Sequence, residues 1–181
     1  MASKEQNAAL AEFAVLAVEC EKKYDMPAEV SCAQWILESS YGARRSGKNN
    51  AFGIKKASRH KSSEWCLTTE VYRTPQDLQQ AVSSGNIRNP EIIYNGPPIT
   101  VACEAEFASF DSMQAAMDDR AILISTAPVY AKAWATWKKT RSLPDFVKQL
   151  AAVYATAPDY AALVLQIARQ DNVTNAIARL R

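Results

Sequence analysis

The segment AQWILESSYG, residues 33–42, carries the strongest fold signal of the chain, and NNAFGIK follows it at residues 49–55. Upstream, Pro27 suits the first turn of a helix, where the N–H that proline lacks would have no partner. An apolar stripe at helical spacing then follows, formed by Val30, Ala33, Leu37 and Tyr41. Gly42 is of the residue type that commonly ends a helix. The sequence therefore predicts a helix with Glu38 in its last turn.

Helical patterns surround a central region of different texture. Residues 6–23 place apolar side chains near helical spacing, and helical patterns resume after Asp111. Their predicted ranges are 112–124, 128–138, 143–155, 158–169 and 172–180. Between them, from about residue 52 to 110, pieces such as EWCLTTEVY and PITVACEAEF favour β-strands. We therefore expect an α+β fold, predominantly α, in which residues 1–181 form a single domain with a small inserted β-lobe.

Within the lobe, residues 73–98 form a longer insertion than a hairpin needs. Thr74 precedes Pro75 and QDLQQAV, a pattern typical of a short helix with a threonine cap. The stretch NPEIIYNGPP, residues 89–98, is rich in turn residues, and we predict a loop that returns the chain to the sheet.

The composition limits the class of protein. Hydrophobic residues make up 48% and charged residues 22% of the chain, as is usual for a globular domain. The net charge of +2 is too small to indicate nucleic-acid binding by itself. No apolar run reaches the roughly 18 residues of a membrane span, and the start, MASKEQNAALAEF, lacks the pattern of a signal peptide. We expect a monomer that does not associate with a membrane.

The residues that often bind metals are sparse. Cys20, Cys32, Cys66 and Cys103 match no CxxC spacing of zinc or redox sites. His60 is the single histidine, which argues against a metal site or a histidine-based triad. We interpret the cysteines as mostly small buried residues, although a Cys66–Cys103 disulfide within the lobe stays open. No metal and no cofactor are predicted.

Glu38 is the first candidate for acid chemistry. A general acid must hold a proton that it can donate, and a carboxylic acid does so at neutral pH only where its surroundings raise its pKa. The end of a helix disfavours an anion, and Gln34 and Trp35, one turn back, could partly desolvate the carboxyl. Position alone, however, also fits an ordinary surface glutamate.

The segments at 33–42 and 49–55 closely resemble the signature of bacterial N-acetylglucosaminidases of the flagellar-muramidase and autolysin type, which have a lysozyme-like fold. Further blocks resemble that family in the same order: Trp65 with Thr68-Thr69-Glu70; Phe107, Phe110 and Asp111-Ser112; and Tyr154-Ala155-Thr156 with Asp159-Tyr160-Ala161. The resemblance covers about residues 26–165. It implies a peptidoglycan hydrolase, such as an autolysin or endolysin, that cleaves the glycan strand after N-acetylglucosamine. Such an enzyme acts on the cell wall, in the periplasm or outside the cell.

The resemblance also implies roles for single residues. Glu38 would be the catalytic acid, Glu70 the second carboxylate, and Tyr154 a cleft tyrosine that orients the sugar or the attacking group. The implied substrate contacts are Asn50, Phe52, Gly53, Trp65 and Tyr160. Three other lobe glutamates stay open as alternatives to Glu70, namely Glu64, Glu104 and Glu106. The N-acetyl group of the substrate is a further alternative nucleophile.

A basic segment leaves a second class of function open. Between Arg44 and Lys61 there are seven Lys/Arg residues and no acid. Such a run is usually a solvated loop, but it also favours attraction to a polyanionic wall or to nucleic-acid phosphates. The alternatives are therefore a muramidase or lytic transglycosylase on the same polymer, and a non-catalytic module that binds wall glycan or nucleic acid. We expect peptidoglycan glycan strands as the partner, and no nucleic acid.

Overall fold

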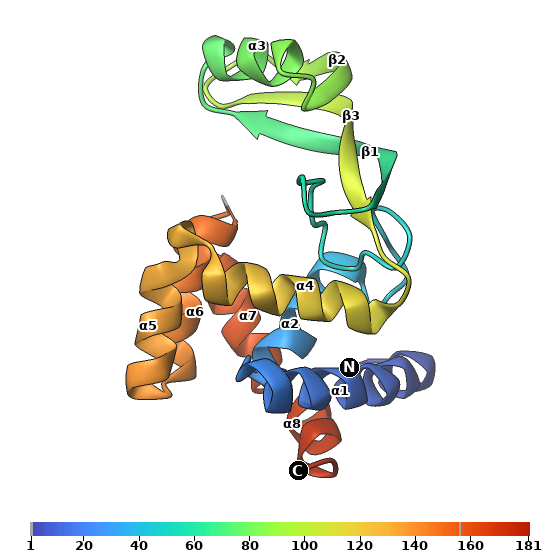
Figure 1. Ribbon diagram of the computed structural model, residues 1–181, viewed down its shortest axis with the longest axis vertical. Helices are drawn as coiled ribbons and strands as arrows, with labels where there is room; N and C mark the ends of the chain where they lie inside the picture. Colours follow the sequence, from blue (N-terminus) through green and yellow to red (C-terminus); the bar gives the residue numbers. More distant parts are fainter. Residues whose placement is uncertain (1, 156) are drawn as a thin grey trace.

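The structure, a computed structural model, describes residues 2–155 and 157–181, so Thr156 of the motif above lies outside the described residues. Its elements are α1 (Lys4–Tyr24), α2 (Ala28–Ser39), β1 (Ser62–Tyr72), α3 (Pro75–Ser83), β2 (Ile87–Tyr94), β3 (Ile99–Ser109), α4 (Met113–Thr126), the 3-10 turn η1 (Pro128–Tyr130), α5 (Ala131–Thr140), α6 (Leu143–Tyr154), α7 (Tyr160–Ala168) and α8 (Asp171–Ala178). The three strands and α3 form a lobe beside a body made of the other helices (Figure 1). The α+β, predominantly α prediction is confirmed.

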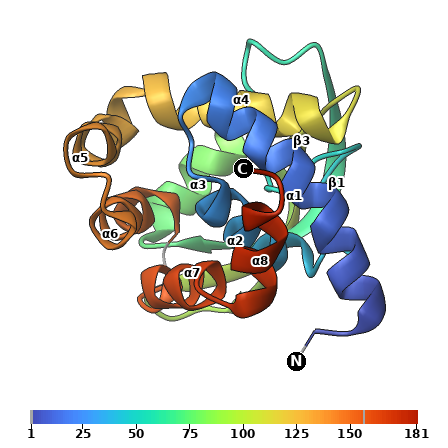
Figure 2. The same ribbon diagram turned by 90° about the horizontal axis from the view of Figure 1, so that it is seen from below.

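Helix α2 lies at the centre of the body, in contact with α1, α7 and α8 (Figure 2). Its buried residues are Ala28, Val30, Ser31, Cys32, Ala33, Gln34, Trp35, Ile36 and Ser39. This helix is therefore buried on most sides rather than along one stripe. Trp35 stacks on Phe13 of α1, with ring centroids 4.2 Å apart and an interplanar angle of 7°. The packing gives the end of α2 a rigid support.

The lobe is a three-stranded antiparallel sheet in the order β1-β3-β2. Thr74 is the N-cap of α3: its hydroxyl accepts from the Asp77 N–H while the Asp77 carboxylate accepts from the Thr74 N–H. The predicted short helix and its cap are thus confirmed. A second small core joins α3 to the sheet and consists of Ala81, Ile87, Ile99, Val101, Cys103, Ala105 and Phe107.

The loop prediction for residues 89–98 is wrong in its first half, because β2 extends to Tyr94. Only the first residue of this strand, Ile87, is buried, so the alternation that identifies a strand in sequence is absent. The register shifts between Arg88 and Glu91, which marks a bulge at Pro90. An edge strand accepts proline there, since the N–H that proline lacks can face solvent.

The connection between α2 and β1 is tied to α4 by a cluster around Asp119. Arg59 donates two hydrogen bonds to this carboxylate, at 2.9 and 2.8 Å, and His60 Nε2 lies 3.1 Å from its Oδ2. His60 Nδ1 accepts from the Ala57 N–H at 2.9 Å, so the ring proton lies on Nε2 and points to Asp119. This cluster fixes the connection where the lobe meets the body.

All four cysteines are free thiols. Cys20, Cys32 and Cys103 are buried and Cys66 is half-buried. In the register of β1 and β3, Cys66 lies opposite Ala105 and Cys103 lies opposite Thr68. The two lobe cysteines are therefore diagonal neighbours, and they form no disulfide.

Candidate active site

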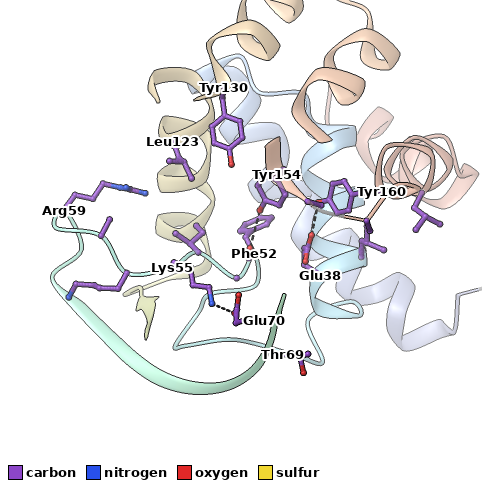
Figure 3. Close-up of a pocket in the computed structure, with 18 residues that line it drawn as sticks. Glu38, Phe52, Lys55, Arg59, Thr69, Glu70, Leu123, Tyr130, Tyr154 and Tyr160 are labelled. Carbon is purple, nitrogen blue, oxygen red and sulfur yellow. Dashed lines mark hydrogen bonds and ion pairs between the residues drawn. The ribbon is translucent and has the colours of Figure 1, made fainter. Parts of the chain in front are cut away.

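A cleft of about 870 Å³ opens between the body and the lobe (Figure 3). The body contributes side chains from α2, α4, η1, the end of α6 and α7, among them Glu38, Leu123, Tyr130, Tyr154 and Tyr160. The lobe and its connection contribute Phe52, Gly53, Ile54, Lys55, Thr69 and Glu70. One wall is therefore rich in tyrosine, while the other carries charge. Such a cleft suits a ligand with apolar faces and polar edges.

The end of α2 determines where Glu38 points. The helix ends at Ser39, earlier than the predicted end at Gly42. Gly42 has a φ of 82°, and a Cβ there would lie 3.2 Å from the Trp35 ring, so glycine is needed. The Ser39 hydroxyl closes this turn by donating to the Trp35 carbonyl and accepting from the Gly42 N–H. Glu38 thus lies in the last helical turn, as predicted, and lines the cleft.

The surroundings of Glu38 favour its protonated form. Its side chain is exposed to the cleft, but the walls displace much of the surrounding water. This burial raises the pKa of Glu38, and the hydrogen bond from Tyr160 and the charge of Arg120 oppose the rise only in part. The Tyr160 hydroxyl donates to Glu38 Oε1 at 2.8 Å. A carboxyl of raised pKa retains its proton closer to neutral pH, as a proton donor must.

Tyr154 lies at the C-terminal end of α6 and lines the cleft beside Glu38. Its hydroxyl donates to the Phe52 carbonyl at 3.3 Å, and its ring stacks on Tyr160 with centroids 5.9 Å apart. Burial raises the pKa of Tyr154 to about 12, so the phenol stays neutral. The side chain therefore joins the body to the connection that leads into the lobe, with its ring in the cleft.

Glu70 extends from β1 into the opposite wall of the cleft (Figure 3). It pairs with the Lys55 ammonium group and accepts from the Thr68 hydroxyl at 3.2 Å. Lys55 in turn lies over the Phe107 ring, 4.1 Å from its centroid. The carboxylate of Glu70 is therefore held by donors on two sides.

The other three lobe glutamates are engaged elsewhere. Glu64 accepts from the Lys48 N–H and the Ser109 hydroxyl. Glu104 pairs with Arg88, and Glu106 accepts from Ser63. None of these three lies among the described residues that line the cleft. The geometry therefore favours Glu70 as the partner of Glu38.

Of the five predicted substrate contacts, Phe52, Gly53 and Tyr160 line the cleft, whereas Asn50 and Trp65 do not. Asn50 is fully buried, and its amide bonds to the backbone of Ile54 and Ala108. Its hydrogen-bonding groups therefore serve the fold. Trp65 and Glu70 are separated by an odd number of positions on one strand, so their side chains point to opposite faces of the sheet. The Trp65 ring is covered by the Arg88 guanidinium, 4.1 Å from its centroid.

Two residues beneath the cleft, Arg120 and Gln34, are absent from the predicted site. Arg120 of α4 is fully buried, and one of its N–H groups donates to Gln34 Oε1. The Gln34 amide donates to the Tyr160 hydroxyl at 2.9 Å. A signal for Arg120 exists in the sequence, since it occupies the same face of its helix as the buried Ala116, Met117 and Ile124.

No group of three or more His, Cys, Asp or Glu side chains in the described part of the chain is arranged to hold a metal ion. Among the same residues, no helix combines the length and the apolar character that crossing a membrane would need.

Comparison with known proteins relates the chain to a family and to a fold. A family model described as mannosyl-glycoprotein endo-beta-N-acetylglucosaminidase matches residues 14–173. A search of curated proteins found no match.

Among solved structures, a peptidoglycan hydrolase mutant from Sphingomonas sp. A1 aligns with a TM-score of 0.66 and 21% identity over 96% of this chain and 99% of that one. The catalytic domain of the autolysin Auto from Listeria monocytogenes aligns with a TM-score of 0.68 and 21% identity, over 97% of this chain and 89% of that one. A C-terminally truncated glycoside hydrolase domain of FlgJ from Salmonella typhimurium aligns with a TM-score of 0.60 and 22% identity, over 91% of this chain and 96% of that one. At these identities the likeness establishes a shared fold. Because the family model covers most of its length, the chain belongs to the glucosaminidase family.

Proposed function

We propose that this protein hydrolyses the glycan strand of peptidoglycan after N-acetylglucosamine, with Glu38 as the general acid. The observation that carries the proposal is a carboxyl of raised pKa at the end of a buried helix, facing an open cleft. Family membership supports the reaction, since the family is described as endo-beta-N-acetylglucosaminidases. The polymer is supported by the Sphingomonas and Listeria structures, which are a peptidoglycan hydrolase and an autolysin.

In the proposed reaction the Glu38 hydroxyl group gives its proton to the glycosidic oxygen as the bond from the sugar C1 to that oxygen breaks. The leaving sugar departs as an alcohol, and a water molecule finally supplies the oxygen at C1. Tyr160 remains hydrogen-bonded to Glu38 Oε1 at 2.8 Å, so it stabilises the carboxylate that forms. Burial keeps the acid protonated before the reaction, and the hydrogen bond favours the anion after it.

Glu70 is the proposed second carboxylate. It lines the wall opposite Glu38, where it could activate water or attack C1. Its bonds to Lys55 and Thr68 fix its orientation. The N-acetyl group of the substrate is the alternative nucleophile, and in that case Glu70 would orient this group. Tyr154 offers its ring to the sugar in the same cleft.

We infer that the protein acts as a monomer on the cell wall, because one chain supplies both walls of the cleft.

Part of the basic segment is engaged within the fold: Arg59 pairs with Asp119, Lys55 with Glu70, and Lys56 lies 3.4 Å from the Ser63 hydroxyl. Other members, such as Arg44 and Lys61, are exposed and can attract the carboxylates of the wall polymer.

The test is digestion of purified cell walls, followed by mass analysis of the fragments. The proposal expects new reducing ends on N-acetylglucosamine, and Glu38→Gln should lower the rate at least about 100-fold. Glu64→Gln is the matched control, because this glutamate lies on the lobe outside the cleft lining. New reducing ends on N-acetylmuramic acid would show a muramidase instead. Full activity of the Glu38→Gln variant would remove the catalytic assignment.

A further inference from the structure

Arg120 is a buried cation at the base of the active site. Its residue is 0% exposed, and no carboxylate among the described residues forms an ion pair with it. Its contacts include the Ser31 hydroxyl at 3.3 Å, Gln34 Oε1, and the Phe52 ring, whose centroid lies 5.0 Å from the guanidinium. Arg120 also interacts with the Tyr154 hydroxyl, which opposes the rise in the pKa of Tyr154. Its Nε has no hydrogen-bond partner. Burying a charge with so little compensation is unfavourable for the fold, which points to a role beyond packing.

The guanidinium sets the direction of a chain of hydrogen bonds. It can only donate, so the Gln34 amide must turn its oxygen toward Arg120. The nitrogen of that amide then donates to the Tyr160 oxygen at 2.9 Å. Because a phenol has a single proton, Tyr160 directs it to Glu38 Oε1. The direction of each hydrogen bond is therefore fixed by the one before it, starting from Arg120, which can donate hydrogen bonds but cannot accept them.

We propose that Arg120 is a positioning residue that acts through Gln34 and Tyr160 to make Glu38 Oε1 the accepting oxygen of the catalytic carboxyl. Oε2 is then the oxygen that carries the acidic proton toward the substrate. When that proton leaves, Tyr160 already donates to the resulting carboxylate, and the positive charge of Arg120 stabilises this carboxylate as well. This inference rests on the proposed role of Glu38.

The decisive variant is Gln34→Glu, which retains the shape of the side chain and gives Arg120 an acidic partner. If Arg120 only served the fold, this variant would be at least as stable as the parent and equally active. In the proposed chain, however, the new carboxylate accepts from both neighbours, so Tyr160 turns its proton away from Glu38. We expect kcat at the pH optimum to fall about 10- to 100-fold while KM changes little.

A second comparison tests whether the loss passes through Tyr160. Tyr160→Phe should lower kcat by a similar factor, and the double variant Gln34→Glu/Tyr160→Phe should be no slower than the slower single variant. Gln166→Glu, on the exposed side of α7, is the matched control. Soluble glycan fragments serve as substrate, and the unfolding temperature shows that each variant is folded. A kcat within twofold of the parent for Gln34→Glu, or losses that multiply in the double variant, would overturn the proposal.

The charge of Arg120 has its own readout, the pH profile of kcat/KM. The titratable or charged groups around Glu38 are Tyr160 on α7, Tyr154 on α6, Arg120 on α4 and Tyr130 on η1. The opposite wall of the cleft adds Lys55, Lys56, Arg59 and Glu70. On the basic side of this profile, kcat/KM falls as Glu38 loses its proton. Because the charge of Arg120 lowers the pKa of Glu38, Arg120→Met should move this fall to higher pH. Arg120→Lys keeps a positive charge and should return the fall to the parental pH. If kcat/KM fell at the same pH in Arg120→Met and Arg120→Lys, the role of the charge would be contradicted. If Glu38→Gln were fully active, the proposed function itself would fail, whatever these variants show.

Discussion

Asn50 allows a direct test of whether the NNAFGIK segment serves the fold or binds the substrate. In Asn50→Ala, three hydrogen bonds disappear: two from the amide to the Ile54 and Ala108 carbonyls, both 2.9 Å, and one from the Ile54 N–H, at 3.0 Å. At roughly 0.5–1.5 kcal/mol for each bond, the free energy of unfolding should fall by about 3 kcal/mol. For a chain of this length, that loss lowers the unfolding temperature by about 6–12 °C.

The neighbouring Asn49 is the control, since its amide makes one such bond, to the Phe110 carbonyl at 2.9 Å. Asn49 has a φ of 56°, which alanine adopts less readily than asparagine, so Asn49→Ala should lose about 2 kcal/mol, of which the bond accounts for about 1 kcal/mol and the backbone for the rest. Unfolding followed by circular dichroism gives the stabilities, and cleavage of soluble glycan well below the transition gives KM. A parental unfolding temperature for Asn50→Ala, together with a raised KM, would refute the structural role and restore the substrate contact.

Further predictions concern the lobe, its attachment and the thiols. Glu70→Gln should lower kcat at least about 100-fold while Glu64→Gln does not, and equal rates for the two would remove Glu70 from the mechanism. Burial alone would raise the pKa of Asp119, but hydrogen bonds from Arg59 and His60 outweigh it and lower the pKa. Its stabilising effect is therefore present above the ordinary aspartate pKa of about 3.9 and is lost as the pH falls through the lower folded value. The stability gap between the parent and Asp119→Asn, measured by denaturant titration, should accordingly narrow as the pH falls below about 3.9, and a constant gap would contradict this. Among the thiols, half-buried Cys66 should react first with iodoacetamide, as peptide mass mapping would show, whereas burial raises the pKa of Cys32 to about 12.

The helical body could be predicted because its signals are local. The buried positions of α2 act within a turn or two of the chain, as does the Thr74 cap of α3 in the lobe, and the structure agrees with both. Pro27 lies one position earlier than predicted, because it precedes α2 as its N-cap and is not part of the first helical turn. Strand β2 could not be predicted in this way, since only Ile87 of it is buried and its register shifts at Pro90. Such an edge strand is defined by its backbone bonds to β3, which leave no pattern in its side chains.

For the site, the position of Glu38 follows from the helix and from the resemblance, but the set of substrate contacts does not. The resemblance implies cleft roles for both Trp65 and Glu70, although a continuous strand places positions of opposite parity on opposite faces. The two-residue period of the strand thus separates their side chains, and the Arg88 guanidinium covers the Trp65 ring on its face of the sheet. Asn50 shows the opposite limit: nothing local indicates that its amide reaches Ala108, 58 positions away.

Arg120 has a burial that the sequence indicates locally and a hydrogen-bond partner that it does not. Its place on the buried face of α4 can be read from the neighbouring apolar residues, so the sequence indicates a buried cation. Its partner is Gln34, 86 positions away, and only the packing of α4 near α2 reveals that the amide between Arg120 and Tyr160 has a fixed orientation. The direction in which Tyr160 donates is thus a property of the assembled body. Substitutions at Gln34 should therefore alter the chemistry of Glu38 even when they leave every cleft-lining side chain unchanged.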